Sequence, residues 1–221
     1  MKRRIIVKNL LNKELRLSAH PLSYLFLVFS LMALIPGYPI LLGAFFICFG
    51  LFQTFQNGRE TNDVLYSALL PIDKKDVVKA RYIFVCLIQI IALLLMAGLT
   101  ALRMVFFARA TPYVNNAMMN SNPVFLAWTL LIFTLFNTLF VGLFYKTAYK
   151  FGKPFVAFIV ASMLVVCIAE VLHHIPGLEF LNTLDRLPLQ LMLMLFALAI
   201  FVLATIISCR TAQRNFELLD L

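Results

Sequence analysis

The chain has 221 residues, of which 62% are hydrophobic and only 13% charged, and its mean hydropathy is +0.93. Soluble domains carry about 25% charged residues, so this composition excludes a soluble globular protein and predicts an integral membrane protein. The formal net charge of +9 comes from basic residues that cluster beside apolar runs, where such residues orient membrane spans, and we therefore expect no nucleic-acid partner.

Residues 1–20 are basic and amphipathic. On a helical wheel most apolar side chains occupy one half and most polar ones the other, with Glu14 and Ile5 as misfits. The apolar half consists of Ile6, Val7, Leu10, Leu11, Leu15 and Leu17. The pattern predicts an interfacial helix whose cations meet anionic lipid head groups, or alternatively a helix packed on a partner. Pro21 is expected to end this helix and redirect the chain.

Six apolar runs follow, and each is expected to be a transmembrane helix. They are residues 22–35, 40–55, 82–106, 123–145, 154–172 and 188–208. The first is short for a hydrocarbon core of about 30 Å, which needs about 20 helical residues, so it either borrows from the preceding helix or is buried in protein. The polar stretch 108–122 is expected to be an exposed loop, and 173–187 is a second polar excursion.

The expected fold is an all-α membrane protein with three parts. An interfacial helix, 1–20, precedes a six-span domain, 21–208, and a cytoplasmic tail, 209–221, closes the chain. Six spans place both termini on one side of the membrane. Sixteen of the 19 Lys and Arg residues lie on the side of the N-terminus and three on the opposite side, so the positive-inside rule predicts that both termini are cytoplasmic.

The stretch 58–81, between the second and third apolar runs, is predicted to be a structured cytoplasmic loop. Asn62 and Asp63 suit the start of a short helix. Pro71 then splits the stretch, and a second helix is expected to begin after Asp73. A helix, a proline corner and a helix on the cytoplasmic side indicate a surface shaped to contact a partner.

No enzyme motif is present, since the chain lacks a phosphate-binding loop, an HExxH pair and a GxSxG elbow. The four cysteines are isolated and predict neither a zinc site nor a disulfide framework. Glu170, His173 and His174 share one helix face, which suits a metal site or proton relay, or else a solvated interfacial cluster. We expect no catalytic residue, bound metal or cofactor in this chain.

Two amides lie within predicted spans. Gln89 and Asn137 either line a polar path or make interhelical hydrogen bonds. With Glu170, the one acid well inside an apolar run, they are the candidate residues of a translocation path. Phe-rich and Met-rich spans suit an amphipathic or lipid-like cargo, although lipid contact or packing is the commoner explanation for them.

The cytoplasmic loop resembles a known signature. Glu60, Asp63 and the segments 69–72, 74–78 and 80–82 are similar to the loop of ABC-type permeases of the type-2 exporter class, in which an acid precedes an LLP or SLP corner. Residues 10–16, followed by Pro21, are similar to the entry helix of that family. The resemblance is closest to small six-span permeases that include phenol-soluble-modulin exporters.

The resemblance implies a half-transporter of a bacterial plasma membrane, in which two permeases, identical or paralogous, pair and each binds a separate ATPase subunit that holds ATP and Mg²⁺. The loop would be the coupling helix, and the chain would export an amphipathic peptide or lipid-like substrate. The residues implied for ATPase coupling are Glu60, Asp63, Leu70, Pro71, Lys74 and Asp76.

Three other classes remain as alternatives. The membrane component of an energy-coupling vitamin importer has a similar size, but it should show an external pocket with several polar side chains. A peptide-sensing or immunity protein would bind an amphipathic peptide without moving it. A membrane-embedded hydrolase would need a nucleophile and a base at one depth, and the sequence displays no such pair.

Overall fold

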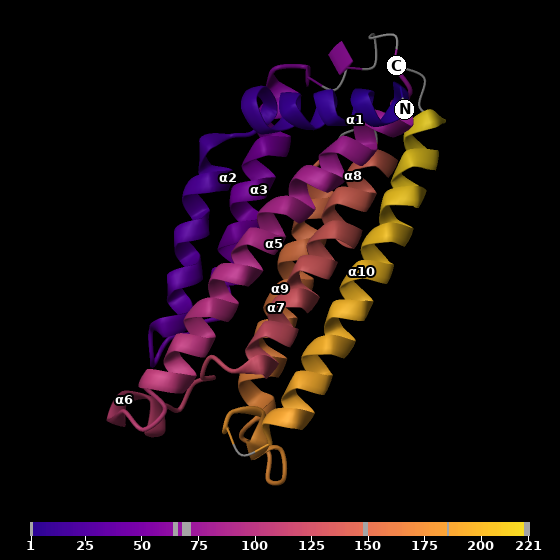
Figure 1. The fold of residues 1–221 in the computed structure, drawn as a ribbon. Helices are drawn as coiled ribbons and strands as arrows, with labels where there is room; N and C mark the ends of the chain where they lie inside the picture. The colour runs from indigo at the N-terminus through magenta and orange to yellow at the C-terminus, as the bar shows by residue number, and fades with distance from the viewer. Residues whose placement is uncertain (1, 64–65, 68–71, 148–149, 185, 219–221) are drawn as a thin grey trace.

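The computed structural model describes residues 2–63, 66–67, 72–147, 150–184 and 186–218, and within these ranges every regular element is a helix (Figure 1). In chain order they are α1 (Lys2–Lys13), the π-helical η1 (Glu14–Ser18), α2 (Pro21–Leu25), the 3₁₀-helical η2 (Phe26–Leu34), α3 (Leu42–Glu60), α5 (Lys74–Phe106), α6 (Thr111–Val114), α7 (Pro123–Leu135), the π-helical η3 (Phe136–Gly142), α8 (Leu143–Lys146), α9 (Gly152–Leu172), η4 (Glu179–Leu181) and α10 (Leu187–Glu217).

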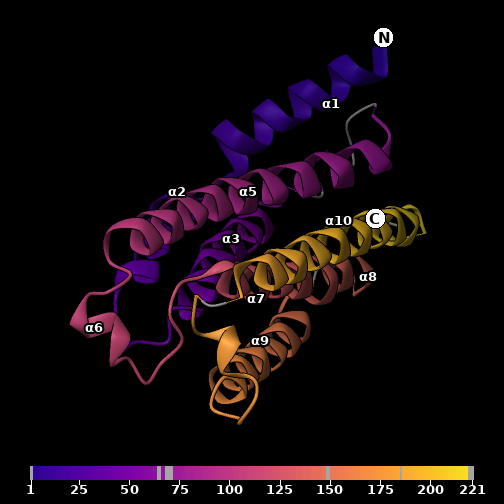
Figure 2. The ribbon, with the colours of Figure 1, turned by 60° about the horizontal axis from the view of Figure 1, so that its bottom comes forward.

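The amphipathic N-terminal helix lies across one end of the bundle (Figure 1). Ile6–Ser18 and Pro21–Leu34 meet at 95°, which confirms that the chain turns sharply at Pro21. The His20 side chain caps the new helix by accepting a hydrogen bond from Leu22 N at 3.2 Å, and proline at the first helical position costs no backbone bond. Figure 2 shows α1 on the side of α5, with α9 on the opposite side.

Four of the described helices are long and apolar enough to cross a membrane, and the bent pair at Pro21 makes a fifth if it counts as one span. The four are Lys74–Phe106, Pro123–Lys146, Gly152–Leu172 and Leu187–Glu217. The chain is therefore a multi-pass, all-helical membrane protein, as its composition predicts. The predicted span 40–55 falls in α3, which packs against η2 and α5, and the count of six spans stays a prediction.

Two glycines of α3 allow α2 and η2 to approach it closely. A Cβ atom added at Gly50 would lie 2.8 Å from Phe26 Cβ and 2.9 Å from the Leu22 carbonyl oxygen. One added at Gly43 would lie 2.6 Å from the Phe29 carbonyl oxygen. Small residues at helix contacts in membranes let the backbones pack directly, so these glycines set the spacing between α3 and its neighbours.

Phenylalanine rings fill the space between α3, η3 and α9. Phe133, Phe136 and Phe140 are fully buried. Phe52 of α3 stacks on Phe155 of α9 with ring centroids 3.7 Å apart. Stacked and edge-to-face aromatic pairs contribute about 0.5–1.5 kcal/mol beyond their buried area. These rings therefore serve as packing, the commoner of the two explanations for the Phe-rich spans.

The last helix is longer than the sequence predicts. The sequence predicts a sixth span over 188–208 followed by a tail over 209–221, whereas α10 continues without a break to Glu217. Its end contacts the start of α5, because Lys75 Nζ lies 2.8 Å from Glu217 Oε1 and Gln213 Nε2 donates to the Lys75 carbonyl oxygen at 3.0 Å. The two helices are thus joined at the end of the bundle where α1 lies.

The prediction of an exposed loop over 108–122 is wrong for the second half of that stretch. Met119, Ser121 and Asn122 are at most 1% exposed, and Asn120 is 7% exposed. Asparagine is common in loops because its side chain bonds to nearby backbone. In this protein, side-chain hydrogen bonds instead join the segment to other elements, and the segment is buried against them.

Candidate functional site

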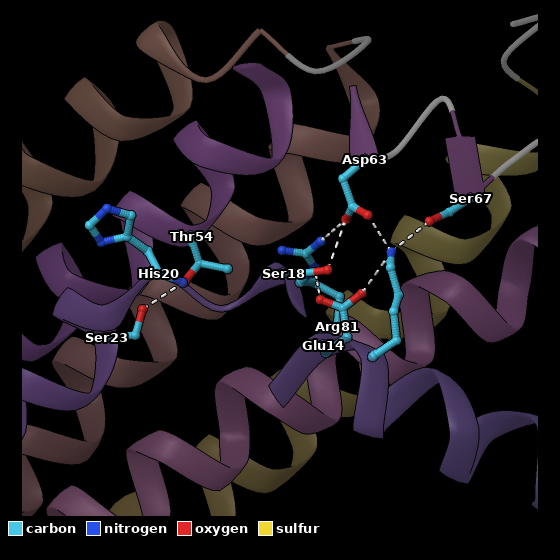
Figure 3. Close-up of polar contacts among 9 residues, drawn as sticks. Glu14, Ser18, His20, Ser23, Thr54, Asp63, Ser67 and Arg81 are labelled. Carbon is cyan, nitrogen blue, oxygen red and sulfur yellow. Dashed lines mark hydrogen bonds and ion pairs between the residues drawn. The ribbon is translucent and has the colours of Figure 1, made fainter. Parts of the chain in front are cut away.

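Four charged side chains meet at the end of the bundle covered by α1 (Figure 3). Arg81 of α5 places Nε 2.7 Å from Glu14 Oε2 and Nη2 2.9 Å from Asp63 Oδ2. Lys13 Nζ lies 2.5 Å from Asp63 Oδ1 and 3.7 Å from Glu14 Oε1. We call Lys13, Glu14, Asp63 and Arg81 the four-charge cluster. Each of its carboxylates contacts both cations, so the α1–η1 stretch, the segment after α3 and α5 are joined at one point.

Hydroxyl groups extend the cluster. Ser18 Oγ donates to Asp63 Oδ2 at 3.2 Å, and Lys13 Nζ donates to Ser67 Oγ at 2.7 Å. A second set of bonds lies beside it (Figure 3), where His20 N donates to Thr54 Oγ1 at 3.0 Å. The chain after α3 is therefore bonded to the α1–η1 stretch at Asp63 and at Ser67.

The cluster has a buried centre and balanced charges, because Glu14 and Arg81 are buried while Lys13 and Asp63 are half-buried. The side chains of Glu14 and Arg81 are only 2% and 5% exposed, and two cations face two carboxylates. Burial raises the pKa of Glu14, while the nearby cations Arg81 and Lys13 oppose that rise. A buried ion pair adds little net stability compared with apolar residues, but removing one partner leaves an uncompensated charge. The cluster therefore favours one arrangement of its three segments.

Sequence reasoning missed Lys13, Glu14 and Arg81 as functional residues, although one signal was visible. Glu14 is a misfit on the apolar half of the helical wheel, and such a misfit indicates a buried partner. The structure also differs from the predicted helical wheel. Leu17, placed on the apolar half, is 78% exposed, whereas Leu10, Glu14 and Ser18 are buried. The cause is the π-helical turn η1, in which Ala19 N bonds to the Glu14 carbonyl oxygen and which widens the repeat beyond 3.6 residues.

The structure describes four of the six residues implied for ATPase coupling. Glu60 is exposed at the last position of α3. Lys74 begins α5, and its Nζ lies 5.9 Å from the centroid of the Phe216 ring. Asp63 and Asp76 face the interior, with Asp63 in the four-charge cluster and Asp76 only 3% exposed. Leu70 and Pro71 lie outside the described residues.

Gln89 and Asn137 bond to each other in the middle of the bundle. Gln89 Nε2 donates to Asn137 Oδ1 at 3.0 Å, and Asn137 Nδ2 donates to Gln89 Oε1 at 2.9 Å and to Thr205 Oγ1 at 3.1 Å. Both amides are 0% exposed. Tyr82 and Ser208 both donate to the Asn137 carbonyl oxygen, which lies in the π-helical η3. This geometry matches the interhelical hydrogen bond rather than an open path.

Replacing Gln89 by leucine should lower the free energy of unfolding by about 1 kcal/mol, because interhelical hydrogen bonds in membranes contribute about 0.6 kcal/mol on average. The measurement is denaturant unfolding of the purified chain in detergent. Ile90→Leu, at a lipid-facing position of the same helix, is the matched control. An unchanged stability would show that the Gln89–Asn137 pair does not hold the helices together.

Glu170 lies at the other end of the bundle from α1. Its Oε2 accepts a hydrogen bond from Met119 N at 2.9 Å, and this places it with the 115–122 segment rather than with the Gln89–Asn137 pair. Within that part of the chain no three His, Cys, Asp or Glu side chains are placed to hold a metal ion. His173 is 6% exposed, whereas His174 beside it is exposed and Glu170 is half-buried, so of the three only His173 departs from a solvated position.

Comparison with known proteins gives one match. A family model described as "ABC-2 family transporter protein" matches residues 6–217. No curated protein and no solved structure matches the chain. The matched range includes the four-charge cluster, the Gln89–Asn137 pair and Glu170.

Proposed function

The chain belongs to the ABC-2 family of transporter proteins, and we propose that it is the permease subunit of an exporter driven by a separate ATP-binding-cassette ATPase. The family is a membrane transport component and not itself a catalyst. The proposed cargo is an amphipathic peptide or a lipid-like molecule that leaves the cytoplasm or the inner leaflet. Two permeases, identical or paralogous, would pair around it.

The four-charge cluster is the observation that best supports this proposal. The segment after α3 is where the resemblance places ATPase docking, and Asp63 in that segment bonds directly to Arg81 of α5. A helix of 33 residues is about 50 Å long at 1.5 Å per residue, which exceeds the thickness of a bilayer. A displacement of the docking segment would therefore reach α5 through a partly buried, charge-assisted contact.

The proposed mechanism assigns different roles to the coupling residues. Glu60 and Lys74, with Leu70 and Pro71 between them, would form the surface that the ATPase touches. Asp63 would carry the motion inward to Arg81. ATP binding closes the two ATPase subunits, and that closure would shift the permease between inward-facing and closed states.

The proposed orientation follows the charge distribution. The end with α1 and the four-charge cluster would face the cytoplasm of a bacterial cell, and α2 with η2, together with α3, would complete six spans. The exposed Leu17 side chain, on the α1–η1 stretch that lies across this end, would then insert among lipids.

Co-purification tests the proposal. The tagged chain is extracted from its native membranes in a mild detergent, and bound chains are identified by mass spectrometry. We expect a stoichiometric ATPase subunit, and Glu60→Lys should reduce its recovery several-fold because it reverses an exposed charge on the docking surface. Glu179→Lys, the same change at the opposite end of the bundle, is the control and should leave recovery unchanged.

One outcome would contradict the permease assignment, and another would contradict only the position of the docking surface. A stable chain that is recovered without any ATPase would favour the sensing or immunity alternative. An ATPase that is recovered equally with the wild-type chain and with Glu60→Lys would leave the permease assignment intact but would move the docking surface away from Glu60.

A further inference from the structure

A short segment between α6 and α7 closes over the end of the bundle opposite α1. We call residues 115–122 the strap. In Figure 1 it leaves α6 and crosses to the start of α7, near the loops that follow α9. Its second half is buried although it has no regular structure. Buried backbone groups need hydrogen-bond partners, so the partners of the strap decide what holds it in place.

Side chains from other elements hold the backbone of the strap. Met119 N donates to Glu170 Oε2 at 2.9 Å, and Asn120 N donates to Asn182 Oδ1 at 2.6 Å. The Ser121 carbonyl oxygen accepts from Arg103 Nη1 at 3.3 Å. A strand or helix would be held by backbone pairing along its length. The strap depends on individual side chains, and some of them are titratable.

His173 is the titratable group with the most distinctive surroundings. Its Nε2 lies 3.3 Å from the carbonyl oxygen of Ala117 in the strap, and its Nδ1 lies 3.3 Å from the carbonyl oxygen of Ala169. A carbonyl oxygen only accepts hydrogen bonds. Neutral imidazole has one N–H and can satisfy one of the two carbonyls, whereas the imidazolium ion has two N–H groups and satisfies both.

Two further features place negative charge near this ring. His173 directly follows the last residue of α9, where the negative end of the helix dipole attracts a cation. The Ala169 carbonyl is among the last four of α9, which lack partners within the helix. Glu170, three residues earlier, adds a carboxylate on the same face.

From this geometry we infer that His173 is a pH-sensitive latch: its imidazolium form fastens the strap to α9 through Ala117, and loss of the proton releases that bond. The latch would hold the strap closed under acidic conditions and loosen it as the pH rises through the range in which histidine titrates. In the orientation proposed above, the latch would respond to the pH outside the cell.

Other charged and titratable groups lie near the strap. On α9, Glu170 precedes His173 by three residues, and the His174 ring centroid lies 4.2 Å from that of His173. From α5, Arg103 contacts the strap at Ser121 and lies over the Tyr113 ring at 5.0 Å. A group whose protonated form gains partners in the closed state stabilises that state at low pH and loses the effect as the pH rises.

Amide hydrogen exchange of the full chain in lipid nanodiscs tests the latch. The reporter is a peptide that covers residues 117–121, with rates corrected at each pH by the same peptide in the unfolded chain. Between pH 5.5 and 8 we expect its protection in the wild-type chain to fall about fivefold, the effect of losing one hydrogen bond. His173→Gln has no titratable ring, and its protection should not depend on pH.

Two variants separate His173 from its neighbours. His174→Gln removes an adjacent exposed imidazole, and Glu170→Gln keeps an acceptor for Met119 N, so both should retain the pH dependence of the wild-type chain. Protection in the wild-type chain that is constant with pH would overturn the proposal without need of any variant. The same would follow if His173→Gln kept the wild-type dependence, or if His174→Gln abolished it.

Discussion

Replacing Arg81 by methionine is expected to lower the free energy of unfolding by about 3–5 kcal/mol, the usual cost of removing one partner from a buried ion pair. Methionine keeps much of the apolar stem but provides no charge, so Glu14 would keep only Lys13, at 3.7 Å, and Asp63 would lose its closest guanidinium contact. The measurement is denaturant unfolding in detergent, followed by the fluorescence of Trp128, the single tryptophan.

Two further variants separate the loss of the Arg81 charge from the loss of its packing. Lys79→Met removes an exposed cation from the same helix and should change stability little. The double variant Glu14→Met with Arg81→Met removes one cation and one anion, and it leaves Lys13 paired with Asp63. It should therefore recover most of the stability that the single variant loses. If the double variant were as unstable as the single one, packing of Arg81, rather than its charge, would be the cause.

Replacing Gly50 by valine is expected to be similarly disruptive, with a cost of about 1–3 kcal/mol or more from overpacking. The new Cβ atom would lie 2.9 Å from the Leu22 carbonyl oxygen, and a backbone atom cannot move aside as a flexible side chain can. We expect α2 to separate from α3, which would also strain the bond from His20 N to Thr54 Oγ1. Thermal unfolding of the purified chain in detergent measures the loss.

Gly98→Val is the control for this change. Gly98 also lies within an apolar helix, but a Cβ atom added there meets nothing within 4 Å. Both substitutions place the same β-branched residue in a helix, so the difference between them isolates the contact with α2. Equal loss of stability in the two variants would show that helix propensity, and not close approach, accounts for the effect.

The sequence predicts the larger features of this molecule because they follow from hydropathy and from single residues with strong backbone preferences. The apolar runs predict the long helices, and Pro21 predicts the 95° turn. Asp73 likewise marks the residue before α5. Each of these signals is local, since it depends on residues that are neighbours in the sequence.

The candidate site could be predicted only in part, because its parts are distant in sequence. Asp63 belongs to a recognisable loop, but its partner Arg81 lies 18 residues further on, and Glu14 is separated from both by the whole of α2, η2 and α3. The burial of the strap is not predictable from sequence for a related reason. A run of asparagines looks like a solvated loop, and only the fold brings Asn182 and Glu170 close enough to bond its backbone.

The 3₁₀ geometry of η2 resolves the apparent shortness of the first apolar run. A 3₁₀ helix rises about 2.0 Å per residue, compared with 1.5 Å in an α-helix. Five α-helical and nine 3₁₀ residues therefore extend about 25 Å, whereas the same residues as one α-helix would extend about 21 Å. The longer rise per residue brings the length of this run closer to that of a hydrocarbon core of about 30 Å without additional residues. In the proposed orientation, α1 would then need to add no residues to the span.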